Sequence, residues 1–239
     1  MTVALAVGVL ATAAAVQAAT GFGFALTAVP LLTLALGPQP AVVTVLVVGL
    51  VLSVGVAVRE RGHVRRRDAV TVGLAGLVGM PIGLLALITA TERALTVVIS
   101  LVLLGSIVLL GRGLRLPRGP RTEIGAGLLS GMLLTSTSMN GPPLVVAFQA
   151  QGLPPREMRA TLATIFVVHG AVAVALVAAA GQVTEGVAVT AAAGIPAIVV
   201  GWFAGDRVFR RLDATAFRRV VIAMLTVTAL VALSTAFLG

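Results

Sequence analysis

The first 58 residues of this 239-residue chain contain no ionisable side chain. About 20 apolar residues are enough to cross the hydrocarbon core of a bilayer, which is about 30 Å thick. A soluble protein needs charged and polar side chains over most of its surface, and this segment supplies no charge at all. Over the whole chain 59% of the residues are hydrophobic and 10% are charged, against about 25% charged in an average soluble domain. The chain is therefore expected to fold within a membrane.

All 17 basic residues are arginine, and the formal net charge is +9. They lie in short runs between apolar blocks, which is typical of a membrane topology signal and not of a nucleic-acid-binding face. The absence of cysteine excludes disulfides, thiolate metal sites and cysteine nucleophiles. No positively charged region of the signal-peptide kind precedes the apolar start, so we expect that start to remain in the mature protein.

Charged interruptions divide the chain into eight apolar blocks. They are residues 3–36, 41–58, 69–91, 94–111, 124–150, 160–180, 186–204 and 220–238. Most have the length of one spanning helix, but the first and fifth would form straight helices of about 50 and 40 Å. We expect both to be broken or re-entrant, at Thr20-Gly21-Phe22-Gly23 and at Asn140-Gly141-Pro142-Pro143, because glycine and proline interrupt helices.

The two halves of the chain resemble each other. A shift of 115 residues places residues 37–40 on 152–155 and residues 79–81 on 194–196, with glycine and proline matching in both segments. This predicts an internal repeat of four blocks each. The expected division is a first transmembrane repeat at 1–111, a cytoplasmic linker at 112–123 and a second transmembrane repeat at 124–239.

The arginine runs also predict an orientation. Residues 59–67 and 112–121 place the loops before the third and fifth blocks in the cytoplasm. The arginine run 207–219 lies on the same cytoplasmic side only if the fifth block turns back within the membrane. Treating the first block alike gives repeats of opposite orientation with both termini outside, as in many secondary transporters. No basic residue reports the side of the first block.

The polar run Thr135, Ser136, Thr137, Ser138, Met139 and Asn140 lies at half depth in the fifth block. Lipid cannot satisfy these groups, so protein or a water-filled cavity is expected around them. The alternative is that the hydroxyls bond to carbonyls one turn earlier or join helices. We favour a substrate site, with Gly141 at its edge.

The first block contains a counterpart, which ends in two closely spaced glycines. Its residues are Gln17, Thr20, Gly21, Phe22, Gly23 and Phe24. A half-helix that starts after such a turn directs its positive end toward an anion. Close packing through small residues is the alternative, and it is our interpretation of the spaced glycines at 73, 76, 79 and 83.

All eight acidic residues lie at block boundaries, so no carboxylate is expected deep in the membrane for a proton relay. His169 is the one titratable side chain well inside a block. It is a candidate proton site, although we favour a structural hydrogen bond to a neighbouring helix. Arg159 opens the sixth block and is a candidate contact for an anion from the cytoplasm, with anchoring of the loop as the alternative.

Enzyme motifs such as H-E-x-x-H and G-x-S-x-G are absent from the sequence, which argues against an enzyme. A non-catalytic membrane scaffold or assembly subunit has no need of a polar cluster at half depth. An anion channel is the other alternative to a carrier. We expect no cofactor, no metal and no nucleic-acid partner.

The glycine-rich run from Gln17 to Leu26, continuing to Pro30, resembles the opening of the sulfite exporter TauE/SafE family, also called toluene-sulfonate uptake permeases. The run from Asn140 to Val145, with Arg159 downstream, resembles its second signature. The eight segments in two halves also match, so the resemblance covers essentially the whole chain. Many members carry glycine where this chain has Phe22, Phe24, Ser138 and Asn140. The two polar replacements, Ser138 and Asn140, imply a larger, more hydrogen-bonding anion than sulfite.

The resemblance implies a multi-pass transporter of the bacterial inner membrane. Its expected substrates are sulfite, organosulfonates such as sulfoacetate, or related organic acids, moved by alternating access around a site near the bilayer midplane. Amides freed at Gly21 to Phe24 and at Ser138 to Gly141 are expected to bind the anion. The expected partners are this anion, the lipid bilayer and a coupling ion, H⁺ or Na⁺, with a homodimer as an open alternative.

Overall fold

The computed structural model describes residues 2–111 and 116–209, and this part of the chain is helical without a strand. One 3₁₀ turn, η1 (Arg61–His63), joins the third and fourth helices. The α-helices are α1 (Thr2–Thr20), α2 (Phe24–Leu36), α3 (Pro38–Glu60), α4 (Arg66–Thr89), α5 (Glu92–Gly111), α6 (Pro120–Thr137), α7 (Gly141–Gln151), α8 (Pro155–Ala179) and α9 (Glu185–Phe209). The predicted eighth block, 220–238, lies outside the described residues.

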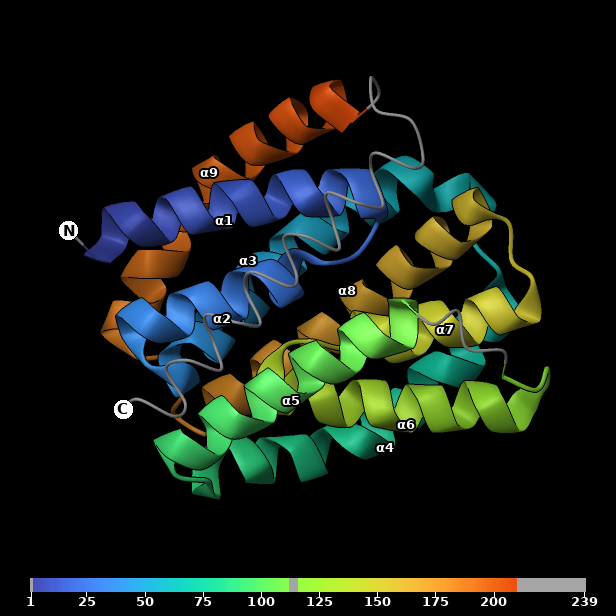
Figure 1. Ribbon diagram of the computed structural model, residues 1–239, viewed down its shortest axis with the longest axis horizontal. Coiled ribbons are helices and arrows are strands. Elements are labelled where there is room, and N and C mark those ends of the chain that lie inside the picture. The colour runs from blue at the N-terminus through green and yellow to red at the C-terminus, as the bar shows by residue number, and fades with distance from the viewer. Residues whose placement is uncertain (1, 112–115, 210–239) are drawn as a thin grey trace.

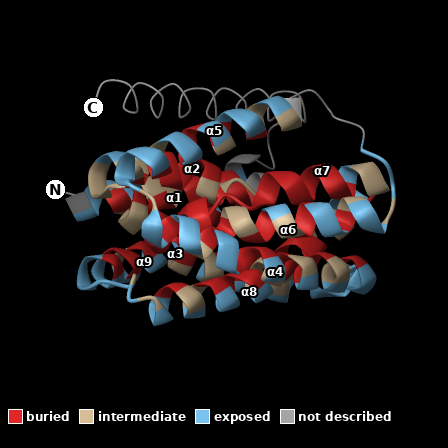
Figure 2. Ribbon diagram, turned by 90° about the horizontal axis from the view of Figure 1, so that it is seen from below, coloured by how far each residue is buried: buried red, intermediate tan, exposed pale blue. Residues whose placement is uncertain are grey.

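Five of these helical stretches are long and apolar enough to cross a membrane. They are Pro38–His63, Arg66–Thr89, Glu92–Leu109, Pro155–Ala179 and Glu185–Arg207. Their outer faces carry exposed apolar side chains, for example Leu74 (61%) and Val78 (67%) on α4. Figure 2 shows buried residues lining the interior of the bundle and exposed ones along its outer faces. Exposed apolar faces of this kind belong in lipid, so the fold is that of an all-helical membrane protein.

Both long apolar blocks consist of two helices. Gly21 (φ 78°) and Gly23 (φ 102°) separate α1 from α2, in a backbone region that glycine adopts without a Cβ clash. In the fifth block α6 ends at Ser138, which has a left-handed φ of 59°. Pro142 and Pro143 were expected to interrupt this block, but they lie in the first turn of α7, where a missing amide costs nothing. The break therefore falls at residues 138–140.

The glycines of α4 form the expected packing seam. A Cβ added at Gly79 or Gly83 would collide with carbonyl oxygens of α6, and one at Gly76 would collide with the ring of His169 on α8. Gly73 differs, since nothing lies within 4 Å of its Cβ position. Small residues thus allow α4 to approach two neighbours closely.

Two pairs of helices pack in parallel across the halves of the chain. Between α4 and α6, Gly127 faces Val72 and Gly131 faces Gly76, so the residue numbers rise together. Between α1 and α9, Gly201 faces Ala11 and Gly205 faces Ala15 in the same sense. Each half therefore inserts its first helix beside a helix of the other half, and α3 packs against α8 between these pairs (Figure 1).

The described arginines, with the exception of Arg93, lie at one end of the bundle. At this arginine-rich end the amide of Arg65 donates to Thr161 Oγ1 at 3.0 Å, which joins the start of α4 to the start of α8. Gln151 Nε2 donates to the Gly119 carbonyl at 3.3 Å, so α7 ends where α6 begins.

The opposite, arginine-poor end joins different elements. Gln39 Nε2 at the start of α3 donates to Gln182 Oε1 after α8 at 2.6 Å and to the Leu87 carbonyl near the end of α4 at 3.4 Å. Val3 and Leu36 line one hollow at this end, so α1 begins where α2 ends. The helices run roughly along the horizontal axis of Figure 1 between these two ends.

Candidate functional site

A small cavity lies where the two helix breaks meet α3 and α8. Its volume is about 50 Å³, and residues of both breaks line it. Eight of the fourteen predicted substrate-binding residues are among the lining residues: Gln17, Phe22, Gly23, Phe24, Ser138, Met139, Asn140 and Gly141. The fold thus brings together two segments that are more than 110 residues apart in the sequence.

The N-terminus of α2 faces this cavity. The first α2 amide with an acceptor in the chain's own backbone is that of Thr27, which donates to the Gly23 carbonyl at 3.1 Å. The amides of residues 24–26 precede it, and no side chain caps the helix. All three residues line the cavity. Because unbonded amides and the helix dipole both favour negative charge, this end of α2 is suited to an anion.

The amides freed by the breaks are not all those that the sequence suggested. The Gly21 amide donates to the Gln17 carbonyl at 2.9 Å, and the Ser138 amide donates to the Leu134 carbonyl at 2.9 Å. These bonds close the last turns of α1 and α6. The expectation of free amides at Gly21 and Ser138 is therefore wrong, and the available amides belong to the helix that follows the break.

The N-terminus of α7 also faces the cavity but offers fewer amides. Pro142 and Pro143 have none, so among the first three residues of α7 only Gly141 has a backbone amide. The side chain of Asn140 lies beside it with 8% of its surface exposed. Its Nδ2 atom is buried and has no hydrogen-bond partner among the described residues. An unsatisfied buried donor of this kind requires a partner, and the cavity is where one can bind.

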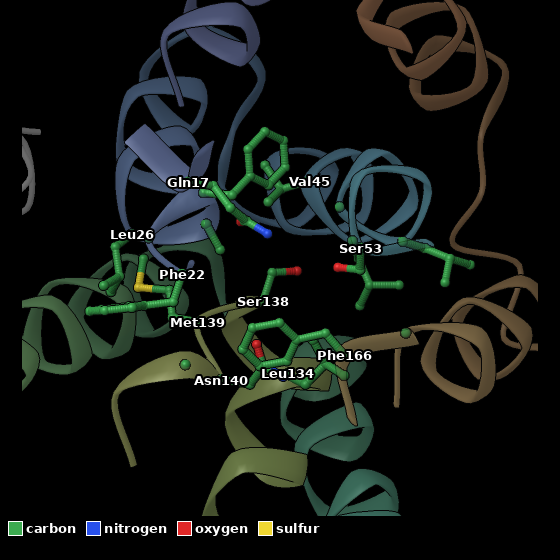
Figure 3. Close-up of a pocket in the computed structure, with 18 residues that line it drawn as sticks. Gln17, Phe22, Leu26, Val45, Ser53, Leu134, Ser138, Met139, Asn140 and Phe166 are labelled. Atoms are coloured by element: carbon green, nitrogen blue, oxygen red, sulfur yellow. The ribbon is translucent and has the colours of Figure 1, made fainter. Parts of the chain in front are cut away.

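Three further polar groups surround the cavity. Figure 3 shows Gln17, Ser53 and Ser138 with their polar ends directed toward its centre. The Ser138 hydroxyl donates to the Val42 carbonyl at 2.9 Å, so its hydrogen is already engaged and only its lone pairs face the cavity. Ser138 therefore fixes the break against α3 rather than serving as a donor to an anion.

Sequence reasoning missed Ser53, together with lining residues such as Gly49, Phe166 and Gly170. Ser53 is 5% exposed and lies on α3, which carries the wall opposite the breaks. The available signal was that Ser53 and Thr44 are the two polar residues of the apolar block 41–58. A single serine in such a block usually satisfies itself on its own helix, which is why it did not stand out.

The other three hydroxyls of the polar run point away from the cavity. Thr135 Oγ1 donates to the Met80 carbonyl of α4 at 2.7 Å. Ser136 Oγ and Thr137 Oγ1 donate to carbonyls one turn earlier, at 2.7 and 2.9 Å. Their geometry is that of helix-packing and back-bonding hydroxyls, and none of the three lines the cavity.

Arg159 lies outside the cavity, next to the first break. Its Cγ is 3.1 Å from the position of a Cβ added at Gly21. Like Arg159, Gly21 is not among the residues that line the cavity. The Arg159 guanidinium lies 5.4 Å from the Trp202 ring centroid, and its Nε is 3.9 Å from Glu60 Oε1. Arg159 thus occupies the region between the cavity and the arginine-rich end. Thr20 ends α1, and its side chain is outside the described residues.

His169 is fully buried at the contact of α8 with α4. Its Nε2 lies 3.0 Å from the Gly73 carbonyl, and its Nδ1 has no partner among the described residues. The cavity is lined by Phe166 and Gly170 of the same helix but not by His169. This is the interhelical hydrogen bond that we favoured for it.

Among the described residues that line the cavity, none has a charged side chain. The donors available there are backbone amides, the Asn140 and Gln17 amides and the Ser53 hydroxyl. Such a set holds an anion by hydrogen bonds and helix dipoles without a fixed counter-charge. In the described part of the chain no group of three or more His, Cys, Asp or Glu side chains is placed to hold a metal ion.

Comparison with known proteins gives two matches. The family model described as "Sulfite exporter TauE/SafE" matches residues 4–232. A "Probable sulfite/organosulfonate exporter TauE" of Cupriavidus necator is 34% identical over 99 residues, which cover 41% of this chain and 37% of that protein. No solved structure matches the chain significantly.

Proposed function

This chain belongs to the sulfite exporter TauE/SafE family, and we propose that it is a secondary transporter whose central cavity binds the oxyanion group of sulfite or an organosulfonate. The relative from C. necator has a name that refers to the same two classes of anion. The observation that carries the proposal is the buried Asn140 Nδ2 donor beside the uncapped start of α2, for which the described part of the chain offers no partner. Both groups are donors, and an anion satisfies both at once.

The donor chemistry favours a weakly basic oxyanion. Three amides of α2, the Gly141 amide and the Asn140 side chain come from different directions, which suits an acceptor with several oxygens. A buried arginine would bind the same group more strongly, by charge-assisted bidentate bonds. Without one, the anion is held by bonds that are easily exchanged for water, which favours release and turnover.

The size of the cavity supports a small anionic group. Its volume of about 50 Å³ is well below the roughly 300–1,000 Å³ of pockets that enclose drug-sized ligands. A group with one sulfur and three oxygens suits such a small site. The organic part of a sulfonate would have to extend between Phe22, Phe24 and Phe166, whose aromatic rings form apolar walls.

We further propose that the two halves are inverted repeats, as the arginine distribution predicted. The α6–α7 hairpin has both ends at the arginine-rich end, and the α1–α2 hairpin has both ends at the arginine-poor end. Their tips meet at the cavity. Access would alternate when one half rocks against the other around the tips. The positive-inside rule places the arginine-rich end in the cytoplasm of a bacterial inner membrane.

A thermal-shift screen of the purified protein tests the proposal. Sulfite, a short alkylsulfonate, sulfate, acetate and chloride are each added at the same ionic strength. A ligand at 100 times its Kd stabilises the folded protein by about 2.7 kcal/mol. We expect sulfite or the sulfonate to raise the melting temperature by a few degrees, with chloride as the baseline.

Asn140→Asp provides the matched control because it keeps the size of the side chain and replaces the donor amide with a carboxylate. The sulfite response should disappear in this variant. A wild-type protein that responds to none of the oxyanions, or an Asn140→Asp variant that responds as the wild type does, would contradict the proposal.

A further inference from the structure

A second concave region lies on the outer surface, between α3 and α9. It is an open groove of about 300 Å³ and shares none of its lining residues with the cavity. Apolar side chains line most of it, including Val51, Val199 and Phe203. Arg59 is the only charged residue among the described residues of the lining. Val51, Val199 and Phe203 are 41%, 49% and 56% exposed. The groove therefore opens onto the lipid-facing surface of the bundle.

Gly55 creates the depth of this groove. It lies in the wall formed by α3, and no atom of the described residues lies within 4 Å of the position of an added Cβ. Glycine in a helix interior is less stable than alanine by about 1 kcal/mol. Elsewhere in the bundle, glycines such as Gly131 allow two helices to touch. Gly55 has no such contact, so its missing side chain serves to leave space.

The groove is polar at one end only. Arg59 is in the last turn of α3, at the arginine-rich end, and Val51 is eight residues deeper. Eight helical residues extend about 12 Å, close to the roughly 15 Å depth of one leaflet's hydrocarbon. Arg59 is exposed and makes no ion pair within the described part of the chain. Trp202 is placed nearby, and tryptophan is enriched at the level of lipid headgroups.

We propose that this groove is a binding site for an anionic phospholipid, with one acyl chain over Gly55 and the phosphate on Arg59. The apolar walls complement the chain, and the one guanidinium complements the headgroup charge. The length of the groove from Arg59 to Val51 matches the hydrocarbon depth of the leaflet at the arginine-rich end. This inference does not depend on which anion the cavity transports.

The site is connected to the first helix break through side-chain contacts. Trp202 lines the groove and also contacts the Arg159 guanidinium, which lies against Gly21. A lipid that fills the groove therefore contacts Trp202, which in turn contacts Arg159. Through this contact the lipid supports the segment that positions α2.

Substitution of Gly55 by leucine tests the acyl-chain part of the site. Leucine fills the groove without a clash, since the space beside Gly55 is open. Purified protein is mixed with equal amounts of phosphatidylglycerol and phosphatidylcholine of identical chains, and bound lipids are counted by native mass spectrometry. The wild type should retain phosphatidylglycerol, and Gly55→Leu should lose most of it. Gly105→Leu on α5, at an exposed glycine with equally open surroundings, is the control and should bind as the wild type.

Substitution of Arg59 by glutamine tests the headgroup part. One basic residue near the membrane surface contributes about fivefold to binding of an anionic lipid. Arg59→Gln should therefore reduce the preference for phosphatidylglycerol over phosphatidylcholine by about fivefold while some lipid stays bound. Arg61→Gln, at an exposed arginine of η1 that does not line the groove, should leave the preference unchanged.

Three results would overturn the proposal. In the first, the wild type and Gly55→Leu retain the same amounts of both lipids. In the second, Gly55→Leu lowers the melting temperature of lipid-free protein, which would show that protein occupies the groove, either residues 220–238 or a second copy of the chain. In the third, Arg59→Gln and Arg61→Gln lose the preference for phosphatidylglycerol equally, which would show that general surface charge, and not the groove, produces that preference.

Discussion

Replacing Asn140 with leucine should have opposite effects on stability and on anion binding. In the anion-free protein Nδ2 is a buried donor without a partner in residues 2–111 and 116–209. Leaving such a group unsatisfied costs about 1–3 kcal/mol. Leucine removes the donor and roughly preserves the volume of a side chain that is 8% exposed. We therefore expect the anion-free variant to be as stable as the wild type or more stable, by up to about 1 kcal/mol.

Anion binding should weaken in the same variant. A hydrogen bond to a charged group contributes about 1.5–3 kcal/mol. Each 1.4 kcal/mol corresponds to tenfold in affinity, so the Kd for sulfite should rise about 10-fold to 150-fold. Isothermal titration calorimetry gives the Kd, and thermal unfolding without ligand gives the stability. The two measurements separate the binding role of the amide from a packing role.

Ser138→Ala is the matched comparison from the same break. Its hydroxyl donates to the Val42 carbonyl, so the substitution removes a buried hydrogen bond between the break and α3. We expect a loss of stability of about 0.5–1.5 kcal/mol and a change in Kd of less than about threefold. If Asn140→Leu melts at a lower temperature without ligand and binds sulfite as tightly as the wild type, then Asn140 has a packing role and the reasoning is refuted.

Three other predictions concern the framework around the site. Gly131→Ala should destabilise the protein by about 1–3 kcal/mol or prevent folding, because its Cβ would collide with the Gly76 carbonyl. Thermal unfolding compares it with Gly125→Ala, a control with open surroundings that should keep the stability of the wild type. Single cysteines introduced into this cysteine-free chain at Gly62 and Val183 lie at opposite ends of the bundle. An impermeant maleimide applied to intact spheroplasts should label the cysteine at 183 and not the one at 62, and the reverse pattern would invert the topology. His169→Gln should retain transport in proteoliposomes, since His169 does not line the cavity, and loss of flux with intact anion binding would identify it as a proton site.

The membrane character and the two broken blocks were predictable because lipid imposes simple constraints. An uncharged block that is much longer than the bilayer thickness must be broken or bent. Glycines, or prolines in the first turn of the next helix, indicate the position of the break. The same constraint identified the region around Asn140, since a polar group at half depth needs protein or water around it. These inferences depend on local sequence and on the thickness of the membrane.

The roles of individual polar residues were less predictable because they depend on neighbours from distant segments. Thr135 and Ser138 are three residues apart in one run, but Thr135 bonds to α4 and Ser138 bonds to α3. Ser53 lines the cavity only because α3 crosses behind both breaks. Which amides are free likewise depended on where α6 ends, at Thr137, three residues before the start of the predicted break at Asn140.

Counterflow in proteoliposomes tests the central claim most directly. Vesicles are loaded with unlabelled sulfite and diluted into a trace of ³⁵S-sulfite, and vesicles loaded with chloride serve as the control. A carrier with a sulfite-binding cavity should accumulate label transiently above the equilibrium level only in the sulfite-loaded vesicles, and Asn140→Asp should abolish this overshoot. Uptake no greater than in protein-free vesicles, or an equal overshoot in the Asn140→Asp variant, would contradict the assignment of the cavity as the transport site.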